Sequence, residues 1–228
     1  MRRRTLLLSL AAVAALAAAG TIAMSVTRAD EPAGCDDIRA YQQRYGQIET
    51  LGDGSGRIAV LGDSYAAGDA LSDRGTRWSD FLAQRATDDT VLLDAVPLTG
   101  YVNEGACGPN AFEDRIDRLV DTGADTLVIQ GGLNDVSAEP ESLRRSAAAV
   151  LDAAEAVPRV VVVGPMDVPG RDGEAAVDVV LAEEAAARGM TYVSALDWDL
   201  PVGRDRIHLT PAGHAEYAER ILGALPRR

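Results

Sequence analysis

Lysine is absent from this chain of 228 residues, so all 22 basic side chains are arginine. We attribute this absence, together with the abundance of alanine, to a coding bias without functional meaning. Positive charge is also scarce beside the 35 acidic residues, and the net charge is −13. Because such a surface repels phosphate backbones, the composition argues against nucleic-acid binding. It leaves neutral sugars, esters and lipids open as ligands.

Histidine and cysteine are scarce as well, with two residues of each type. A metal centre is not indicated, because His208 and Asp205 lack a third ligand at a matching spacing. The chain also lacks internal repeats and low-complexity linkers, and its length suits one domain with a sizeable core. We therefore expect a single monomeric domain over residues 36–228, without a metal or a cofactor.

Residues 1–29 have the composition of an export signal. Three arginines at positions 2–4 precede an uncharged stretch over residues 5–27 that is rich in leucine and alanine. The same stretch is long enough to span a bilayer, so cleavage and retention as a membrane anchor both stay open. In either case the arginines stay inside. We expect a secreted protein or one anchored on the outer face of the cytoplasmic membrane.

The two cysteines, Cys35 and Cys107, follow this export signal. Disulfides persist outside the cytoplasm, so a Cys35–Cys107 bridge is the interpretation that we favour over two unpaired thiols. Such a bridge would attach the N-terminal segment to the loop after Gly100.

From residue 36 onward, short β-branched runs alternate with stretches of helical spacing. Continuous apolar runs separated by helices are typical of a parallel sheet covered on both faces. The fold class is therefore α/β, a three-layer α/β/α sandwich with a five-stranded parallel sheet. The expected helices cover 36–50, 78–85, 111–122, 141–156, 174–188 and 211–225, and the expected strands cover 57–61, 90–96, 126–130, 159–163 and 191–195.

One stretch organises the candidate chemistry. The apolar run 58–61 stops at Gly62, and Asp63, Ser64 and small residues that can begin a helix follow. A buried strand, a tight turn and a helix start place Ser64 at the carboxyl edge of the sheet, near helix N–H donors that favour negative charge. Ser64 is therefore a candidate nucleophile.

Three further stretches also lie where a parallel sheet presents its active edge. They are residues 98–100, 132–135 and 205–208, which come after strands or in the loop before the last helix. Since the carboxyl ends of parallel strands meet at one edge, we expect these stretches to converge on Ser64.

A serine hydroxyl is a weak nucleophile and needs a base within hydrogen-bond reach. Only His208 and His214 are available. Asp205 precedes His208 by three residues, which is close enough to bond one ring nitrogen, fix the tautomer and stabilise the imidazolium. His214 has no such partner and is interpreted as a surface or packing residue. We expect Ser64, His208 and Asp205 to act together.

Attack by Ser64 on a carbonyl creates an oxyanion that needs hydrogen-bond donors. The candidates are the N–H groups of Ser64 and Gly100 and the side-chain amide of Asn134, with Gly105 and Gly108 as competitors of Gly100. Each well-placed donor is worth ~3 kcal/mol of the barrier. Glycine suits this task because a backbone without Cβ can approach a ligand closely.

These motifs resemble those of the SGNH (GDSL-type) hydrolase family, which is named after four residues that here fall on Ser64, Gly100, Asn134 and His208. The Gly-Asp-Ser core, the Gly-x-Asn-Asp set and the Asp-x-x-His set occur in the family's order and cover about residues 58–208. The resemblance implies a flavodoxin-like strand order 2-1-3-4-5 and hydrolysis of esters without a metal.

Other side chains near the motifs have structural interpretations. We expect Asp63 to cap the helix after the turn and Asp135 to bond backbone near the site. Met166 and Trp198 are each either core residues or walls of the pocket. Tyr65 departs from the family's pattern, because many members have leucine there.

The sequence thus predicts a secreted or membrane-anchored serine esterase. Ser64 would form an acyl-enzyme with His208 as base, and water would then release the acid. Small acyl groups on a carbohydrate or cell-wall glycan, or short-chain lipid esters, would be substrates. Two alternatives stay open: an acyltransferase that uses the same acyl-enzyme, and a non-catalytic glycan-binding module. The complete set of Ser64, Asp205, His208 and Asn134 argues against the latter.

Overall fold

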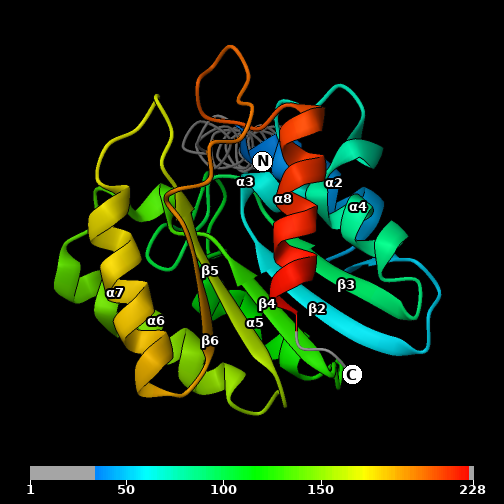
Figure 1. The fold of residues 1–228 in the computed structure, drawn as a ribbon, viewed down its shortest axis with the longest axis horizontal. Helices are drawn as coiled ribbons and strands as arrows, with labels where there is room; N and C mark the ends of the chain where they lie inside the picture. The colour runs from blue at the N-terminus through cyan, green and yellow to red at the C-terminus, as the bar shows by residue number, and fades with distance from the viewer. Residues whose placement is uncertain (1–33, 226–228) are drawn as a thin grey trace, which may run out of the picture.

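The computed structural model describes residues 34–225, so the expected export signal or membrane anchor lies outside the described residues. Six strands form one sheet, in the order β1-β3-β2-β4-β5-β6, with helices on both faces (Figure 1). Five of the strands are parallel and follow the predicted order 2-1-3-4-5, which confirms the α/β/α prediction. The strands are β1 (Glu49–Leu51), β2 (Gly56–Gly62), β3 (Asp89–Ala95), β4 (Thr126–Gln130), β5 (Val160–Met166) and β6 (Thr191–Ala195).

The sixth strand, β1, was not predicted, and the helix expected over residues 36–50 is too long. Helix α2 (Cys35–Tyr45) ends at Gly46, whose φ of 78° lies in the left-handed region that glycine adopts without steric cost. The chain then turns back, and β1 pairs antiparallel with the edge strand β3. A strand of three residues is too short to show a periodicity of its own.

The central strands are buried on both faces, and alternate residues serve two separate cores. In β2, Ile58 and Val60 pack toward α4 and α8, whereas Ala59 and Leu61 pack toward α5, α6 and α7. This arrangement explains why the strands read as continuous apolar runs. The helices are α3 (Ser64–Ala67), α4 (Trp78–Arg85), α5 (Phe112–Val120), α6 (Pro140–Ala154), α7 (Glu174–Ala187) and α8 (Pro211–Ala224), with 3-10 turns at Arg74–Thr76 and Leu133–Asp135.

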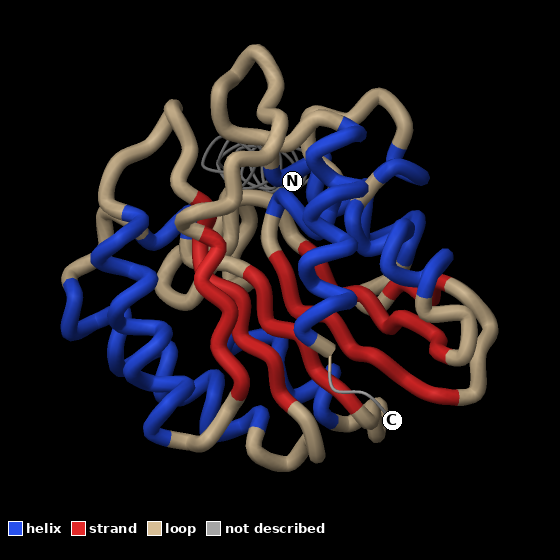
Figure 2. Tube along the Cα trace, in the orientation of Figure 1, coloured by secondary structure: helices blue, strands red, loops and turns tan. Residues whose placement is uncertain are grey.

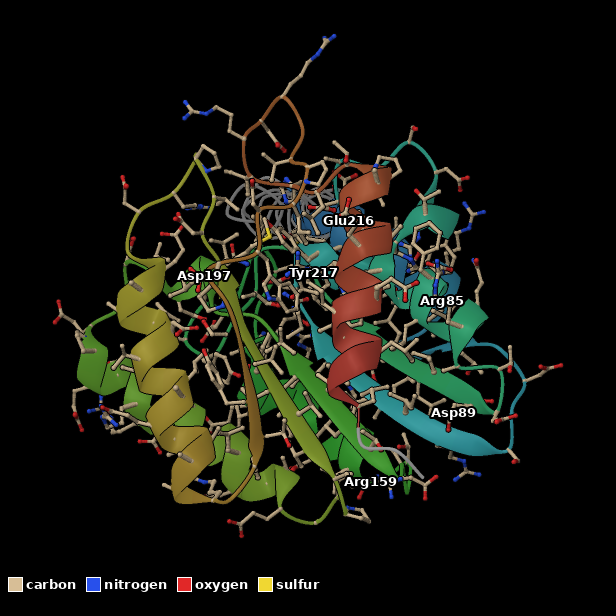
Figure 3. The ribbon with its side chains drawn as sticks, viewed as in Figure 1. Arg85, Asp89, Arg159, Asp197, Glu216 and Tyr217 are labelled. Atoms are coloured by element: carbon tan, nitrogen blue, oxygen red, sulfur yellow. A yellow bond between two sulfur atoms is a disulfide. The ribbon has the colours of Figure 1, made fainter. Side chains whose placement is uncertain are left out.

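An aromatic cluster fills the core beneath α8. The ring of Tyr217, which is labelled on this helix in Figure 3, lies 5.6 Å from Trp78 and 5.0 Å from Trp198. Both tryptophans and Met166 are buried in this core. Of the two interpretations given for Met166 and Trp198, core residue or pocket wall, the structure therefore favours the core. His214 is a packing residue too, because it is buried and its Nδ1 accepts the N–H of Trp78 at 3.2 Å.

The carboxyl ends of the parallel strands point to one edge of the sheet, where long loops gather at the top of the view (Figure 2). The stretches with candidate chemistry all lie at this edge. Across residues 34–225, no helix is both long and apolar enough to cross a membrane.

Candidate active site

Ser64 is the first residue of α3, directly beyond the end of β2. The turn is tight, because a Cβ on Gly62 would lie 2.4 Å from the Cβ of Ala66. Ser64 is 5% exposed. Within residues 34–225, neither its hydroxyl nor its N–H has a hydrogen-bond partner, so both are available to a ligand.

Asp63 caps the short helix that Ser64 begins, as predicted. Its carboxylate accepts the N–H of Tyr65 at 2.9 Å and the side-chain amide of Gln130 at 3.0 Å. Burial raises the pKa of Asp63 to about 6, although both hydrogen bonds oppose the shift. The turn is therefore fixed to the neighbouring strand β4 by a buried, partly compensated carboxylate.

A buried arginine that was not predicted from the sequence supports the Ser64 turn through hydrogen bonds. The guanidinium of Arg115, on α5, donates to the carbonyl of Gly62 at 3.1 Å and to Thr99 Oγ1 at 2.8 Å. It also donates to Asp94 Oδ1 at 2.8 Å and to the carbonyl of Asn110 at 2.9 Å. One side chain thus connects the turn before Ser64 with both ends of the loop that contains Gly100.

The loop after β3 is held by Asp135. The Asp135 carboxylate accepts three consecutive backbone N–H groups, from Tyr101 and Val102 at 2.9 Å and from Asn103 at 3.0 Å. Burial raises the pKa of Asp135, and these hydrogen bonds oppose the shift. A Cβ on Gly100 would lie 2.2 Å from Asp135 Oδ2, so only glycine fits at this position. The interpretation of Asp135 as a residue that bonds backbone is confirmed.

The three candidate oxyanion donors differ in their present partners. Asn134 Nδ2 donates to the carbonyl of Thr99 at 2.9 Å, which uses one of its two N–H groups and joins it to the loop of Gly100. The N–H of Gly100 donates to the carbonyl of Asn103 at 2.9 Å within that loop. Only the N–H of Ser64 has no partner among the described residues.

His208 and Asp205 form a hydrogen-bonded pair in the loop before α8. His208 Nδ1 lies 2.7 Å from Asp205 Oδ2, and Asp205 Oδ1 accepts the N–H groups of Ile207 and His208 at 3.1 Å. Desolvation alone would raise the pKa of Asp205, but these hydrogen bonds and the nearby His208 together outweigh it and hold the pKa below its usual value. Since Nδ1 is engaged, Nε2 is the ring nitrogen that remains for a substrate or a nucleophile.

Tyr65 brings the histidine loop to the serine turn. Its hydroxyl donates to the carbonyl of Ile207 at 2.5 Å, and its ring centroid lies 6.1 Å from that of His208. The residue after Ser64 is therefore bonded to the residue before His208. The tyrosine that departs from the family's usual leucine has a direct structural role.

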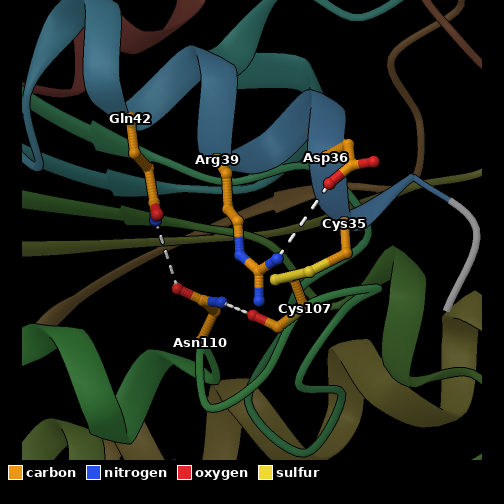
Figure 4. Close-up of a disulfide and its surroundings, with 6 residues drawn as sticks. All are labelled: Cys35, Asp36, Arg39, Gln42, Cys107 and Asn110. Atoms are coloured by element: carbon orange, nitrogen blue, oxygen red, sulfur yellow. Dashed lines mark hydrogen bonds and ion pairs between the residues drawn. A yellow bond between two sulfur atoms is a disulfide. The ribbon is translucent and has the colours of Figure 1, made fainter. Parts of the chain in front are cut away.

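The predicted Cys35–Cys107 disulfide is present and joins α2 to the loop after β3 (Figure 4). Around it, Gln42 Nε2 donates to Asn110 Oδ1 at 3.4 Å, and the Asn110 amide donates to the carbonyl of Cys107. Helix α2 is thus attached to the loop that also contains Gly100.

Several cavities open on the surface, and their positions differ. One of about 440 Å³ is lined by Arg159, which is labelled in Figure 3 and directly precedes β5, so this cavity lies at the opposite end of the parallel strands from Ser64. Another of about 370 Å³ is lined by Asp205 and His208. In the part of the chain that the structure describes, no three His, Cys, Asp or Glu side chains are grouped as metal ligands.

Comparisons with known proteins agree with this geometry. The family described as GDSL-like Lipase/Acylhydrolase matches residues 60–216. A GDSL lipase of Mycobacterium tuberculosis is 30% identical over 190 residues, which cover 72% of this chain and 79% of that protein. An aryl esterase of M. smegmatis shares 20% identity, over 75% of this chain and 100% of that chain, with a TM-score of 0.59. A carbohydrate acetylesterase of Sinorhizobium meliloti shares 15% identity over the same fractions, with a TM-score of 0.60. The two structures, at such low identity, support the fold.

Proposed function

The chain belongs to the GDSL-like lipase/acylhydrolase family and is a carboxylic ester hydrolase, and from this premise we propose that Ser64 is its nucleophile and His208 its base. One observation carries the proposal. The hydroxyl of Ser64, which has no hydrogen-bond partner among residues 34–225, lies at a helix start, and the Tyr65–Ile207 hydrogen bond brings the His208–Asp205 pair to the same edge of the sheet.

The proposed reaction begins when Ser64 Oγ attacks the ester carbonyl while His208 Nε2 accepts the hydroxyl proton. Asp205 holds Nδ1–H and stabilises the imidazolium. The imidazolium then gives its proton to the leaving alcohol, and an acyl-enzyme forms on Ser64. Water, deprotonated by His208, attacks this ester and releases the acid, which restores the serine.

The proposed oxyanion hole combines three donors. Within the described part of the chain, the N–H of Ser64 has no acceptor, and Asn134 retains its second amide N–H. Gly100 contributes its N–H when the substrate oxygen replaces the carbonyl of Asn103 as acceptor. The Asp135 carboxylate holds the following three residues by their N–H groups and so fixes the loop around Gly100, which lowers the reorganisation needed in the transition state.

We propose a location outside the cytoplasm, secreted or anchored through residues 5–27. The arginine-led apolar stretch at the N-terminus and the disulfide support it. The proposed substrates are small acyl groups on carbohydrates or short-chain lipid esters. Similarity to an aryl esterase and to a carbohydrate acetylesterase supports small esters of this kind.

The test is hydrolysis of p-nitrophenyl acetate, butyrate and octanoate by the full chain, followed in the burst and steady-state phases. Ser64→Ala is expected to remove turnover by a factor of about 10⁴ or more, because it lacks the nucleophile. Ser55→Ala is the matched control, since Ser55 is exposed and directly precedes β2 at the other end of this strand. Full activity in Ser64→Ala would contradict the proposed mechanism.

A further inference from the structure

A cavity of about 360 Å³ opens between α2, the end of α3 and the loop after β3. On the basis of the proposed esterase function, we propose that this cavity binds the alcohol part of the substrate, and that this alcohol is a polyhydroxylated ring such as a carbohydrate. The volume falls within the range of small-molecule sites, roughly 300–1,000 Å³.

The cavity wall is built by the two segments that carry the proposed catalytic groups. Ala67 lines the cavity and lies three residues after Ser64, on the same face of α3. The N–H of Asp69 donates to the carbonyl of Ser64 at 3.0 Å. Leu98 also lines the cavity and precedes Gly100 by two residues. The cavity is therefore lined by close sequence neighbours of Ser64 and Gly100, and the proposal places the alcohol part of an ester on Ser64 against them.

The polar groups in the wall match hydroxyl groups. Asp37 and Asp69 offer carboxylate acceptors, while Tyr41 and Arg74 offer donors. A polyol satisfies both kinds of group, because each of its hydroxyls donates and accepts. A hydrocarbon chain would leave the Asp69 carboxylate dehydrated without a partner among residues 34–225, and an anion would be repelled by the two carboxylates.

Asp69 is the most distinctive of these groups. It is half-buried, and its carboxylate has no hydrogen-bond partner among residues 34–225. Burial raises the pKa of Asp69, and the nearby His208 and Arg74 oppose the shift. An acceptor that is partly withdrawn from water and close to the proposed base is thus open to a hydroxyl of the leaving alcohol.

The other walls are preorganised. Arg74 is bonded to Glu49 at 2.9 Å and to the Tyr41 hydroxyl at 3.2 Å, and its guanidinium lies 4.5 Å from the centre of the Tyr41 ring. Leu98 is 46% exposed and has a φ of 64°, an unfavourable backbone conformation that tends to occur at functional sites. Its side chain offers an apolar surface for the C–H face of a ring.

Helix α2 gives this chain a wall that lies outside the family match, which begins at residue 60. The Cys35–Cys107 disulfide attaches this wall to the loop of Gly100. The alcohol preference therefore depends on a segment added in front of the family domain, which the catalytic motifs alone do not encode.

The experiment compares kcat/KM for 6-O-acetylglucose, p-nitrophenyl acetate and hexyl acetate, which share the acyl group and differ in the alcohol. In Asp69→Asn the ratio of the sugar ester to p-nitrophenyl acetate is expected to fall about 10-fold or more, the cost of a lost hydrogen bond to a charged group. Asp88→Asn, which lies before β3 at the other end of the sheet, is the control and is expected to keep the wild-type ratio. Free glucose is expected to inhibit the wild type competitively and Asp69→Asn more weakly.

An unchanged ratio in Asp69→Asn overturns the proposal, and so does a wild type that hydrolyses hexyl acetate in preference to the sugar ester. An equal loss on all three esters also overturns it, because Asp69 would then act through His208 alone. These outcomes leave the esterase function intact, whereas a folded wild type without turnover on any of the three esters removes both proposals.

Discussion

The two halves of the candidate active site are held in opposite ways. The Ser64 turn is buried and braced by distant segments, since Arg115 bonds Gly62 across 53 positions and Gln130 bonds Asp63 across 67. The His208 half is local: its Asp205 partner is three residues away, and the two side chains are 19% and 40% exposed.

Because of this difference, we expect substitutions in the two halves to affect stability and catalysis to different extents. The hydrogen bonds that position Ser64, the proposed nucleophile, are also bonds of the core, so a change there is expected to affect both folding and activity. The hydrogen bonds that orient His208, the proposed base, belong to a surface loop on a rigid scaffold, so a change there is expected to affect activity alone. The predictions below test this separation.

The largest expected effect falls on catalysis in the exposed half. Asp205→Asn is expected to lower kcat by about 10⁴-fold, because the amide favours the wrong histidine tautomer and no longer stabilises the imidazolium. The melting temperature is expected to stay within a few degrees of wild type. Asp199→Asn, an exposed carboxylate in the same loop, serves as the control. A large loss of melting temperature without a loss of kcat would contradict the separation.

The second effect falls on stability in the buried half. Arg115→Met is expected to lower the free energy of unfolding by about 3–5 kcal/mol, because it leaves the buried Asp94 carboxylate with Arg118 as its remaining cation. Urea denaturation measures this change. Arg115→Lys is expected to recover only part of it, since an ammonium does not reproduce the guanidinium fork. Arg145→Met, at an exposed site, is the control, and equal stability of both Met variants would refute the prediction.

The third effect concerns two buried groups whose contributions to the free energy of unfolding depend on pH in opposite ways. Burial raises the pKa of Asp63 from 3.8 to about 6, so its contribution to stability falls as pH rises through this window. Burial lowers the pKa of His214 from 6.5 to about 4, so its contribution falls as pH drops through nearly the same window. Between pH 4 and 6, Asp63 and His214 therefore change the free energy of unfolding in opposite directions.

Replacing either Asp63 or His214 is expected to reveal how the other one makes the free energy of unfolding depend on pH. Relative to wild type, the free energy of unfolding of Asp63→Asn is expected to rise by about 2 kcal/mol between pH 4 and 6, because the variant lacks the titration of Asp63. His214→Asn, which keeps an acceptor for the N–H of Trp78, is expected to show the opposite trend. Urea denaturation at several pH values measures the free energy of unfolding of all three proteins. If this free energy had the same pH dependence in the wild type and both variants, the shifted pKa values of Asp63 and His214 would be refuted.

The smallest effect falls on the hydrogen bond that joins the halves. Tyr65→Phe removes the hydroxyl that donates to the carbonyl of Ile207. The expected loss is about 1 kcal/mol in stability and about 5-fold in kcat, because one neutral hydrogen bond positions the histidine loop. Tyr192→Phe, which removes a hydroxyl bonded to Asp178 away from the site, is the control and is expected to alter stability alone. Unchanged kcat in Tyr65→Phe would mean that the loop is positioned without this bond.

The sequence predicted the strands and the motif residues well, because both signals are local. The strand expected over 126–130 is β4 as found, and the Gly-Asp-Ser turn follows β2 as expected. The pairing of Cys35 with Cys107 was also predicted, because only two cysteines exist.

Contacts between distant segments were the part that sequence could not supply. Strand β1 exists because it pairs with β3, and three residues carry no pattern of their own. The need for glycine at position 100 comes from the Asp135 carboxylate, which is 35 positions away. Arg115 did leave a signal, since a charged residue interrupts the apolar stripe between Phe112 and Ile116.

The disulfide has a further consequence in the unfolded chain. It closes a covalent ring across 72 positions that contains Ser64 and Gly100 but excludes Asn134 and His208. A ring of this length removes chain entropy worth about 4 kcal/mol from the unfolded state. When the chain refolds with its disulfide intact, the segment with Ser64, the proposed nucleophile, is therefore already closed into a ring, whereas the segment with His208, the proposed base, lies outside that ring.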